Sequence, residues 1–596
     1  GSARREEPGE SVMFIATRRI RGVDPGRASD VESSKAVGKI YEGLVQYSYL
    51  HRPYRIEPLL AEAMPRVSED GLTYTFRIRK GIFYQDDPCF AATGGRGREL
   101  AAGDFIYAIK RVADVKNESG GYWAFESKIE GLDDFRRASA GAAATGYDTP
   151  VRGLQAPDPH TLVIRLTEPY PQIQWVLSMN YAFAVPREAV ERYGEDFSAH
   201  PVGTGPYILK SWRRNYMQEF VRNPKWAETG RVELYPRDGE PLDAAAGLLS
   251  DAGRQLPFLD RIVQYVMDDE STQWLTFVMG GSDASTIARD NWDAVVSRNR
   301  ELAGALAKMK IRMFGAPVMN VFYIGFNMDD PVVGGNRKLR QALSCAFNTG
   351  DWLSFKKEQS VRATGPIPPG VSGHEDKPSP HPFDLAKARR LLREAGYPDG
   401  IEQATGRRLK LVMDLGDANS AEIRQTTELI IGFMRKIGVE LVPSYNLRPA
   451  FFAKLDRRQC QMFRVGWIAD YPDAQNFLQL FYGPNGSPGP NHANYVNPEF
   501  DALYEKVRTM KDSPERTALY SRMADIVIED CPWVFVDYPV DYGLYHCWLG
   551  NYKPHDFPYG MYKYYKVNTK ARREWRETWG KKDWRARATE GPGERM

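Results

Sequence analysis

Short motifs that mark many enzyme active sites are absent from the sequence. There is no GxSxG elbow, no HExxH pair, no GxxxxGK[ST] phosphate loop and no GxGxxG at the start of a helix. Histidine is scarce, with eight residues in the chain. Two of them, His374 and His381, share a loop and are interpreted as a solvent-exposed pair rather than as metal ligands. We therefore predict that the protein is not an enzyme and has no catalytic residue, no metal and no cofactor.

Cysteine is also scarce. The five cysteines are scattered and form no CxxC pair, which excludes a zinc ribbon and a thioredoxin-type redox pair. Cys531 and Cys547 lie closest in sequence, but spacing alone does not show whether they form a disulfide. Cysteine usage therefore leaves the cellular compartment open.

Neither sign of charge dominates, and no long apolar run is present. The 80 basic and 77 acidic residues give a net charge of +3. This balance does not indicate the basic domain or stripe expected of a nucleic-acid-binding protein. No stretch approaches the about 18 consecutive apolar residues that a membrane-spanning helix needs. The sequence therefore predicts no nucleic-acid partner and no membrane span.

The first residues are polar and resemble a processed terminus. Gly1-Ser2 is typical of a cloning scar, and the first apolar segment starts at Val12. We expect that a signal peptide or lipoprotein leader preceded this region. The expected location is periplasmic or extracellular, with a lipid anchor on the removed leader as one alternative.

A chain of 596 residues exceeds the about 250–300 residues that one hydrophobic core supports, so several domains are expected. Strand and helix patterns alternate, which favours an α/β fold. In the clearest unit, a strand over 409–413 precedes a helix capped by Asn419, and Gly438 ends that helix before a strand over 439–442. The aromatic content of 12% fits either large cores or a ligand cleft walled by rings.

A series of short segments, in one order over nearly the whole chain, resembles the extracellular solute-binding proteins of family 5, the periplasmic oligopeptide- and dipeptide-binding proteins of ABC transporters. The loop at 90–99 and the final residues lie outside the resemblance. The segments are Val23-Asp24-Pro25, Ile40 to Val45, Pro58 to Glu62, Tyr74 to Ile82, Asp104-Phe105 with Lys110-Arg111, Gly203 to Tyr207, Leu259 to Ile262, Phe326-Asn327, Leu339 to Ser344, Ala386 to Gly396, Gly466 to Asp473, Asn494-Tyr495 and Glu499 to Asp501.

The resemblance implies a two-lobed type II periplasmic-binding-protein fold, with an extra subdomain inserted in the first lobe. Ligands of this family sit between the lobes and are enclosed when the lobes close. The chain is expected to cross between lobes near 314–319 and near 538–544. The expected parts are a tag and leader remnant at 1–11, lobe 1 at 12–50 and 156–317, the extra subdomain at 51–155, lobe 2 at 318–540, a return to lobe 1 at 541–570, and a charged C-terminal tail with a docked helix at 571–596.

The segment from Met462 to Asp470 carries the predicted ligand residues. If it is extended, Arg464, Gly466 and Asp470 share one face, and a peptide of roughly three to five residues spans the about 20 Å between the two charges. A glycine between them lets a ligand backbone approach. Trp467 points to the opposite face on strict alternation, so its role is either a pocket wall or core packing.

The resemblance implies roles for these residues. The family carries its amine-binding aspartate at the position of Asp470, and its oligopeptide-binding members carry a carboxylate-binding arginine at the position of Arg464. Trp467, Gly466 and Tyr471 complete the predicted ligand-binding set. Asp470 as a turn residue and Arg464 as a rim charge are the alternatives. Ile468 replaces a cysteine of some relatives, and Ala474 replaces a usual proline.

The sequence therefore predicts a monomeric solute-binding receptor of an ABC-type uptake transporter, with a short peptide as its ligand and a membrane permease as its partner. Other members of the family bind sugars, opines, metal chelates or haem, so a non-peptide solute is the alternative. A hydrolase that pairs Asp470 with Asp473 is the rival from another class.

Overall fold

The computed structural model describes residues 9–228, 233–288, 291–297, 300–302, 304–357, 359–557 and 559–579. The chain divides into two compact units. Unit 1 comprises residues 1–315 and 542–596, and unit 2 is the continuous segment 316–541. The chain enters unit 2 within strand β12 (Ile311–Pro317) and leaves it within strand β18 (Trp533–His546).

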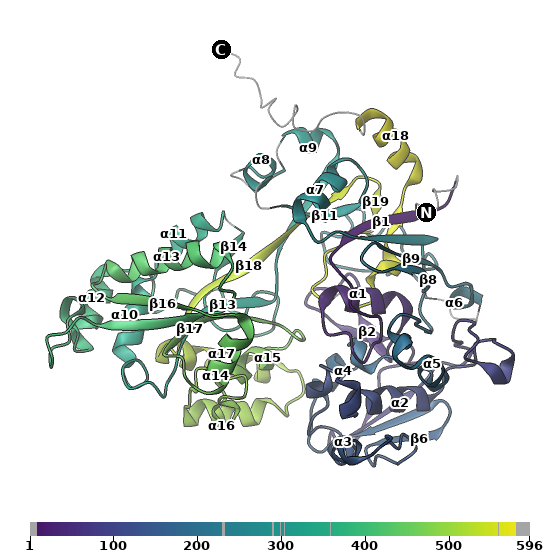
Figure 1. Cartoon of the computed structure of the whole chain (residues 1–596), viewed down its shortest axis with the longest axis horizontal. Helices are drawn as coiled ribbons and strands as arrows, with labels where there is room; N and C mark the ends of the chain where they lie inside the picture. The colour runs from purple at the N-terminus through teal and green to yellow at the C-terminus, as the bar shows by residue number, and fades with distance from the viewer. Residues whose placement is uncertain are drawn as a thin grey trace. The chain divides into compact units, whose positions relative to one another are not determined.

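Unit 1 is built around a four-stranded sheet of order β1-β10-β9-β8. β1 and β10 are parallel, and the other neighbours are antiparallel. The N-terminal strand β1 (purple in Figure 1) therefore pairs with a strand formed about 250 residues later. The elements of this part are β1 (Val12–Thr17), α1 (Val31–Ile40), β2 (Val45–Tyr47), β3 (Ile56–Pro58), α5 (Arg187–Tyr193), β8 (Tyr207–Arg213), β9 (Met217–Arg222), α6 (Pro224–Glu228), β10 (Arg261–Val266), α7 (Glu270–Val278) and β11 (Ala284–Thr286).

A second four-stranded antiparallel sheet in unit 1 has the order β4-β5-β7-β6. A subdomain that ends at residue 155 would cut this sheet, because β7 ends at Arg165 and pairs with both β5 and β6. A boundary after Arg165 keeps the sheet whole. Its elements are β4 (Arg66–Val67), β5 (Thr73–Arg77), α2 (Ala102–Ala113), α3 (Leu132–Gly141), β6 (Leu154–Asp158), β7 (Thr161–Arg165) and α4 (Ile173–Val176).

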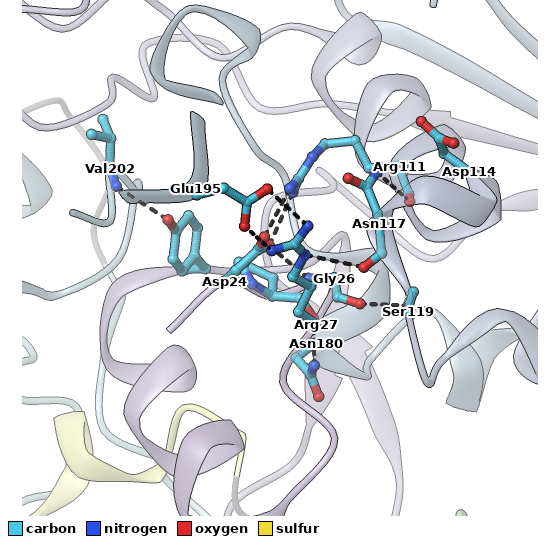
Figure 2. A network of polar contacts seen from close by, with 12 residues as sticks. Asp24, Gly26, Arg27, Arg111, Asp114, Asn117, Ser119, Asn180, Glu195 and Val202 are labelled. Carbon is cyan, nitrogen blue, oxygen red and sulfur yellow. Dashed lines mark hydrogen bonds and ion pairs between the residues drawn. The ribbon is translucent and has the colours of Figure 1, made fainter. Parts of the chain in front are cut away.

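Two segments of the family resemblance meet in a buried ion pair of unit 1 (Figure 2). Arg111 of α2 donates to both carboxylate oxygens of Asp24, at 3.0 and 2.8 Å. Both side chains are buried. Asp24 also accepts from the backbone N–H of Gly26, which fixes the turn around Pro25. The pair therefore anchors α2 to the opening segment of the chain.

The last helix of the described residues is α18 (Thr569–Trp579), which is docked on unit 1. Arg572 donates to the Asp283 carboxylate at 2.8 Å and to the backbone carbonyl of Val12 at 2.7 Å. Asp283 also accepts from the Trp548 indole and from the backbone N–H of Phe14. The docked helix predicted for this region is present, and the predicted tail beyond residue 579 lies outside the described residues.

Unit 2 has a sheet in which β18 pairs with β13 and β14, and β13 pairs with β17, β17 with β15, and β15 with β16. Its main apolar core lies among the strands and helices α10 to α13, and it includes Phe326, Leu343, Leu411 and Met434. The elements are β13 (Asn320–Phe326), α10 (Arg337–Ala346), α11 (Thr349–Phe355), β14 (Ser360–Arg362), α12 (Leu385–Glu394), β15 (Lys410–Leu415), α13 (Ala421–Arg435), β16 (Glu440–Tyr445), α14 (Arg448–Asp456), β17 (Met462–Ile468), α15 (Gln475–Leu478), α16 (Pro498–Val507) and α17 (Pro514–Asp530).

The predicted strand–helix–strand unit is confirmed as β15, α13 and a parallel β16. Its helix cap was wrong by one residue, because Ser420 and not Asn419 accepts from the third backbone N–H. Glu422 forms an ion pair with Lys356 at 2.6 Å. Gly438 has φ of +83°, the left-handed conformation that glycine adopts without strain.

The structure also shows the surroundings of the cysteines and of two histidines. All five cysteines are free, with Cys531 in unit 2 and Cys547 in unit 1.

The interpretation of His374 and His381 as a solvent-exposed pair was wrong. His381 is buried, and the His374 ring bonds the backbone carbonyl of Ile367 at 2.7 Å. Among the described helices, none is long and apolar enough to cross a membrane.

Candidate functional site

The predicted ligand residues lie on β17 of unit 2 and on the turn that follows it. β17 is regular from Met462 to Ile468 and pairs along its length with β13. Asp470 lies beyond the end of the strand, so strict alternation does not extend to it. The structure instead divides the predicted residues into two groups, one around Asp470 and one around Arg464.

Asp470 and Trp467 meet at the side chain of Asn476. The Asn476 amide nitrogen donates to the Asp470 carboxylate at 3.0 Å. Its amide oxygen accepts from the Trp467 indole at 3.0 Å and from the backbone N–H of Asp470 at 3.1 Å. Because one fully buried amide holds both residues, the carboxylate and the indole have fixed positions relative to each other.

The Asp470 carboxylate has no cation partner among the described residues. Burial raises its pKa, and the hydrogen bond from Asn476 opposes that change. Asp470 is half-buried, and a partly desolvated carboxylate without a counter-charge favours the approach of a cation, such as a ligand ammonium group. The geometry is therefore suited to bind an amine.

Arg464 belongs to the second group, on the core side of the sheet. Its guanidinium donates to the Thr426 hydroxyl of α13 at 2.7 Å and lies 4.9 Å from the ring centre of Trp352. Burial lowers its pKa, and the negative charges of Asp537 and Glu422 oppose that change. No carboxylate of the described chain forms an ion pair with Arg464, so its guanidinium has hydrogen-bonding capacity left for a solute anion.

Gly466 has a packing explanation in the structure. A Cβ at this position would lie 2.5 Å from the ring of Phe322, which is its partner on strand β13. The glycine therefore makes room for a ring of the protein. Whether a ligand backbone also approaches it is a separate matter, and that role stays a prediction.

Tyr471 and Asp473 point into the interior of unit 2. The buried Tyr471 hydroxyl donates to Gln475 at 2.8 Å. Asp473 pairs with Arg516 at 2.8 Å and accepts from the Tyr520 hydroxyl at 2.8 Å. Because its carboxylate is already paired, Asp473 is poorly placed to act with Asp470 as a pair of catalytic carboxylates.

Sequence reasoning missed three residues of this region. Asn476 and Thr426 carry no signal beyond their polarity, because their role depends on which strand end faces them. Asp537 lies on β18 in register with Phe322 of β13, which in turn pairs with Gly466 of β17. A buried carboxylate in an apolar strand is the one signal that pointed to it.

Two other features of the described residues bear on chemistry. Within the described residues, no group of three or more histidine, cysteine or acidic side chains is arranged to hold a metal ion. A pocket of about 430 Å³ in unit 1 is lined by charged side chains. Its arginines are already paired, Arg98 with Asp104 and Glu188, and Arg187 with Asp148 and Glu191.

Comparison with known proteins shows relatives over most of the chain. Heme-binding protein A of Haemophilus influenzae is 24% identical over 539 residues, which cover 89% of this chain and 88% of that protein. Glutathione-binding protein GsiB of Salmonella typhimurium is 26% identical over 533 residues, which cover 88% of each chain.

A solved structure confirms the predicted fold. The ABC transporter-associated periplasmic binding protein DppA from Helicobacter pylori, in complex with the peptide STSA, matches with a TM-score of 0.67 at 21% identity. The match covers 94% of this chain and 98% of that chain. The α/β fold of periplasmic binding proteins, predicted from the sequence, is therefore confirmed.

The family model for bacterial extracellular solute-binding proteins, family 5 (middle), matches residues 55–489. This span contains Arg111 but not its partner Asp24. It also contains Arg464, Asp470 and Asn476. The predicted resemblance is confirmed, and the chain belongs to the bacterial extracellular solute-binding proteins of family 5.

Proposed function

We propose that this protein is the solute receptor of an ABC-type uptake transporter, that it binds short peptides, and that Asp470 holds the peptide α-ammonium group. The observation that carries the proposal is the half-buried Asp470 carboxylate, which is fixed by Asn476 and has no cation partner in the described chain. The peptide-bound relative and the glutathione-binding relative support a peptide ligand.

In this proposal the remaining predicted residues have supporting roles. Trp467, fixed by the same Asn476, forms a wall beside the ammonium group. Arg464 receives the peptide carboxylate, and Gly466 and Tyr471 shape the segment between the two charges. The two units act as lobes that close around the peptide, and the closed form is the one a membrane permease recognises. The location is periplasmic or extracellular, and the protein acts as a monomer.

Binding without catalysis is part of the proposal. A peptide or sugar hydrolase would need a second free carboxylate near Asp470, and the neighbouring Asp473 is committed to Arg516 and Tyr520. Incubation with a peptide mixture should leave every peptide intact. The appearance of cleavage products in the presence of protein would contradict this part.

The test of the amine-binding role uses the variant Asp470→Ala. Loss of one partner from a buried charge pair costs about 2–5 kcal/mol, so affinity for a free tripeptide should fall about 30-fold or more. The same tripeptide with an acetylated amine should bind the variant and the wild type equally. Isothermal titration calorimetry measures both affinities. The exposed Asp456 of α14 provides the control Asp456→Ala, which should bind like the wild type.

Equal affinity of Asp470→Ala and wild type for the free tripeptide would contradict the assignment. Native mass spectrometry of the purified protein identifies the solute independently. Release of short peptides supports the proposal, whereas release of haem, a sugar or a metal chelate would keep the receptor function and replace the ligand class.

A further inference from the structure

A second buried carboxylate, Asp537 of β18, lies near Arg464 in unit 2. β17 and β18 both pair with β13, so Gly466, Phe322 and Asp537 form one row across three strands. Side chains opposite one another in antiparallel strands share a face of the sheet. Asp537 therefore lies on the same face as Arg464, which is two residues before Gly466 on β17.

The Asp537 carboxylate is buried but poorly paired. The residue is 2% exposed, and no ion pair reaches it from the described part of the chain. The nearby Trp352 Nε1 and Ser360 Oγ are buried and make no hydrogen bond of normal geometry. Both nevertheless lie near enough to lower the pKa of Asp537, against the larger opposite effect of burial. Three polar groups therefore converge without saturating one another.

Trp352 links the two charges. The Arg464 guanidinium lies over its ring at 4.9 Å, and the indole nitrogen is on the side of Asp537. Arg464 raises the charged fraction of Asp537, and Asp537 does the same for Arg464. The two side chains thus act as mutual counter-charges at a distance, with no bond between them.

Two cations, Lys356 and Arg464, lower the pKa of Asp537. Lys356, which follows α11, is paired with Glu422 of α13 at 2.6 Å. Arg362 of β14 stands opposite Asp537 in the strand register but is exposed to solvent. Phe322 of β13 is apolar. Arg464 is therefore the one unpaired cation on the buried side of Asp537 in the described residues.

A solute carboxylate at Arg464 would disturb this arrangement. It would take over the positive charge that now balances Asp537, and it would place a second anion near the buried Asp537 carboxylate. Repulsion between two like charges at a site of low dielectric constant is strong enough to change an affinity on the order of 100-fold. Protonation of one carboxylate removes the repulsion.

We propose that Asp537 is a specificity-determining residue, and that the site accepts a solute carboxylate at Arg464 together with one proton on Asp537. The proton comes from the solvent and bonds to a carboxylate oxygen of Asp537, and no covalent bond of the solute changes. A neutral group, such as a carboxamide, binds at Arg464 without the proton. The inference rests on the proposed function, because it assumes that Arg464 receives the solute's terminal group.

The test compares a tripeptide that has a free carboxyl terminus with its C-terminal amide. Calorimetry between pH 5 and 7 keeps the peptide carboxylate ionised and the peptide amine protonated, because their ordinary pKa values are about 3.5 and 8. The ratio of the two affinities cancels any effect of Asp470, since both peptides carry the same amine. Titrations in two buffers of different ionisation enthalpy give the number of protons taken up.

In the wild type, the affinity for the acid relative to the amide should fall as pH rises, by up to about tenfold per pH unit. Proton uptake should accompany the acid and not the amide. In Asp537→Asn the ratio should no longer depend on pH, and Asp537→Glu should restore the dependence. The control Asp456→Asn should behave like the wild type.

A ratio that is constant with pH in the wild type, or that varies with pH equally in Asp537→Asn, would overturn the inference. The buffer comparison needs only wild-type protein, so it decides the matter even where a variant does not fold. Binding of neither peptide contradicts the proposed function itself and, with it, this inference. Binding of both peptides without proton uptake contradicts the inference alone.

Discussion

Buried carboxylates have different surroundings in different parts of the molecule. In unit 1, Asp24 and Asp283 each meet an arginine at 2.8 Å, and both partners of each pair are almost fully buried. In unit 2, the half-buried Asp470 and the buried Asp537 have no ion pair from the described chain. Arg464 has one hydroxyl partner, Thr426. Asp473, three residues after Asp470, is paired with Arg516.

This contrast separates charges that hold the fold from charges that are open to a solute. Burial of a charge costs free energy of desolvation unless the charge is paired. An unpaired buried charge therefore persists where another interaction offsets that cost. For the pairs of unit 1 the balance is internal. For Asp470 we propose that a ligand supplies it. Arg464 is balanced at a distance by Asp537, and we propose that a solute carboxylate takes over that role.

The largest expected effect comes from breaking the pair shown in Figure 2. Arg111→Ala leaves the Asp24 carboxylate buried without its cation, so the free energy of unfolding should fall by about 3–5 kcal/mol. Urea denaturation followed by circular dichroism measures it. Glu195→Ala removes the exposed ion pair with Arg27 in the same network and should cost less than about 1 kcal/mol. Equal losses in both variants would remove the distinction on which the comparison depends.

A somewhat smaller contrast is expected within unit 2, between two aspartates three residues apart. Asp473→Ala strands Arg516 and removes an acceptor from Tyr520, so it should lower the free energy of unfolding by about 3 kcal/mol. Asp470→Ala removes no ion pair and should lower it by about 1 kcal/mol or less. Differential scanning calorimetry without ligand compares the two variants. A loss for Asp470→Ala as large as that for Asp473→Ala would assign Asp470 a structural role.

The smallest expected effect has the opposite sign. Asp537→Asn removes an unpaired buried charge and should raise the free energy of unfolding at neutral pH by about 1 kcal/mol. The folded-state pKa of Asp537 is raised above its unfolded value, mainly by burial. Its cost to stability is therefore absent below about pH 4. The cost grows as pH rises toward the folded-state value.

The stabilising effect of Asp537→Asn should thus be present at pH 7 and vanish below about pH 4. Urea denaturation at pH 3.5 and pH 7 gives the two free energies of unfolding. Destabilisation by the variant at pH 7 would show that Asp537 has a partner that stabilises the fold.

Local patterns predicted much of the fold. The unit β15–α13–β16 follows from side-chain periodicity, and the helix end at Gly438 follows from glycine's freedom at positive φ. Both are properties of neighbouring residues. The cap at Ser420 shows the limit of this reasoning, since Asn419 and Ser420 are both good capping residues and only the backbone decides between them.

The site was predicted in part, and what was missed depends on sheet order. Asp470, Trp467 and Arg464 were found through their sequence segment. Their grouping was not, because Asn476 joins Asp470 to Trp467 only once the chain turns after β17. Asp537 lies near Arg464 because their strands, β18 and β17, both pair with β13. Nothing in the sequence encodes that order locally.

The ion pair between Arg572 and Asp283 has a consequence for the order in which parts of the chain can fold. A chain is synthesised from its N-terminus, and Asp283 appears 289 residues before the arginine that neutralises it. Unit 2 is continuous and is complete in sequence at residue 541, so it can fold as a unit while unit 1 still lacks its final helix. Helix α18 can dock only after Arg572 has been synthesised, and a chain cut short before Arg572 contains all of unit 2 but lacks the cation that pairs with Asp283.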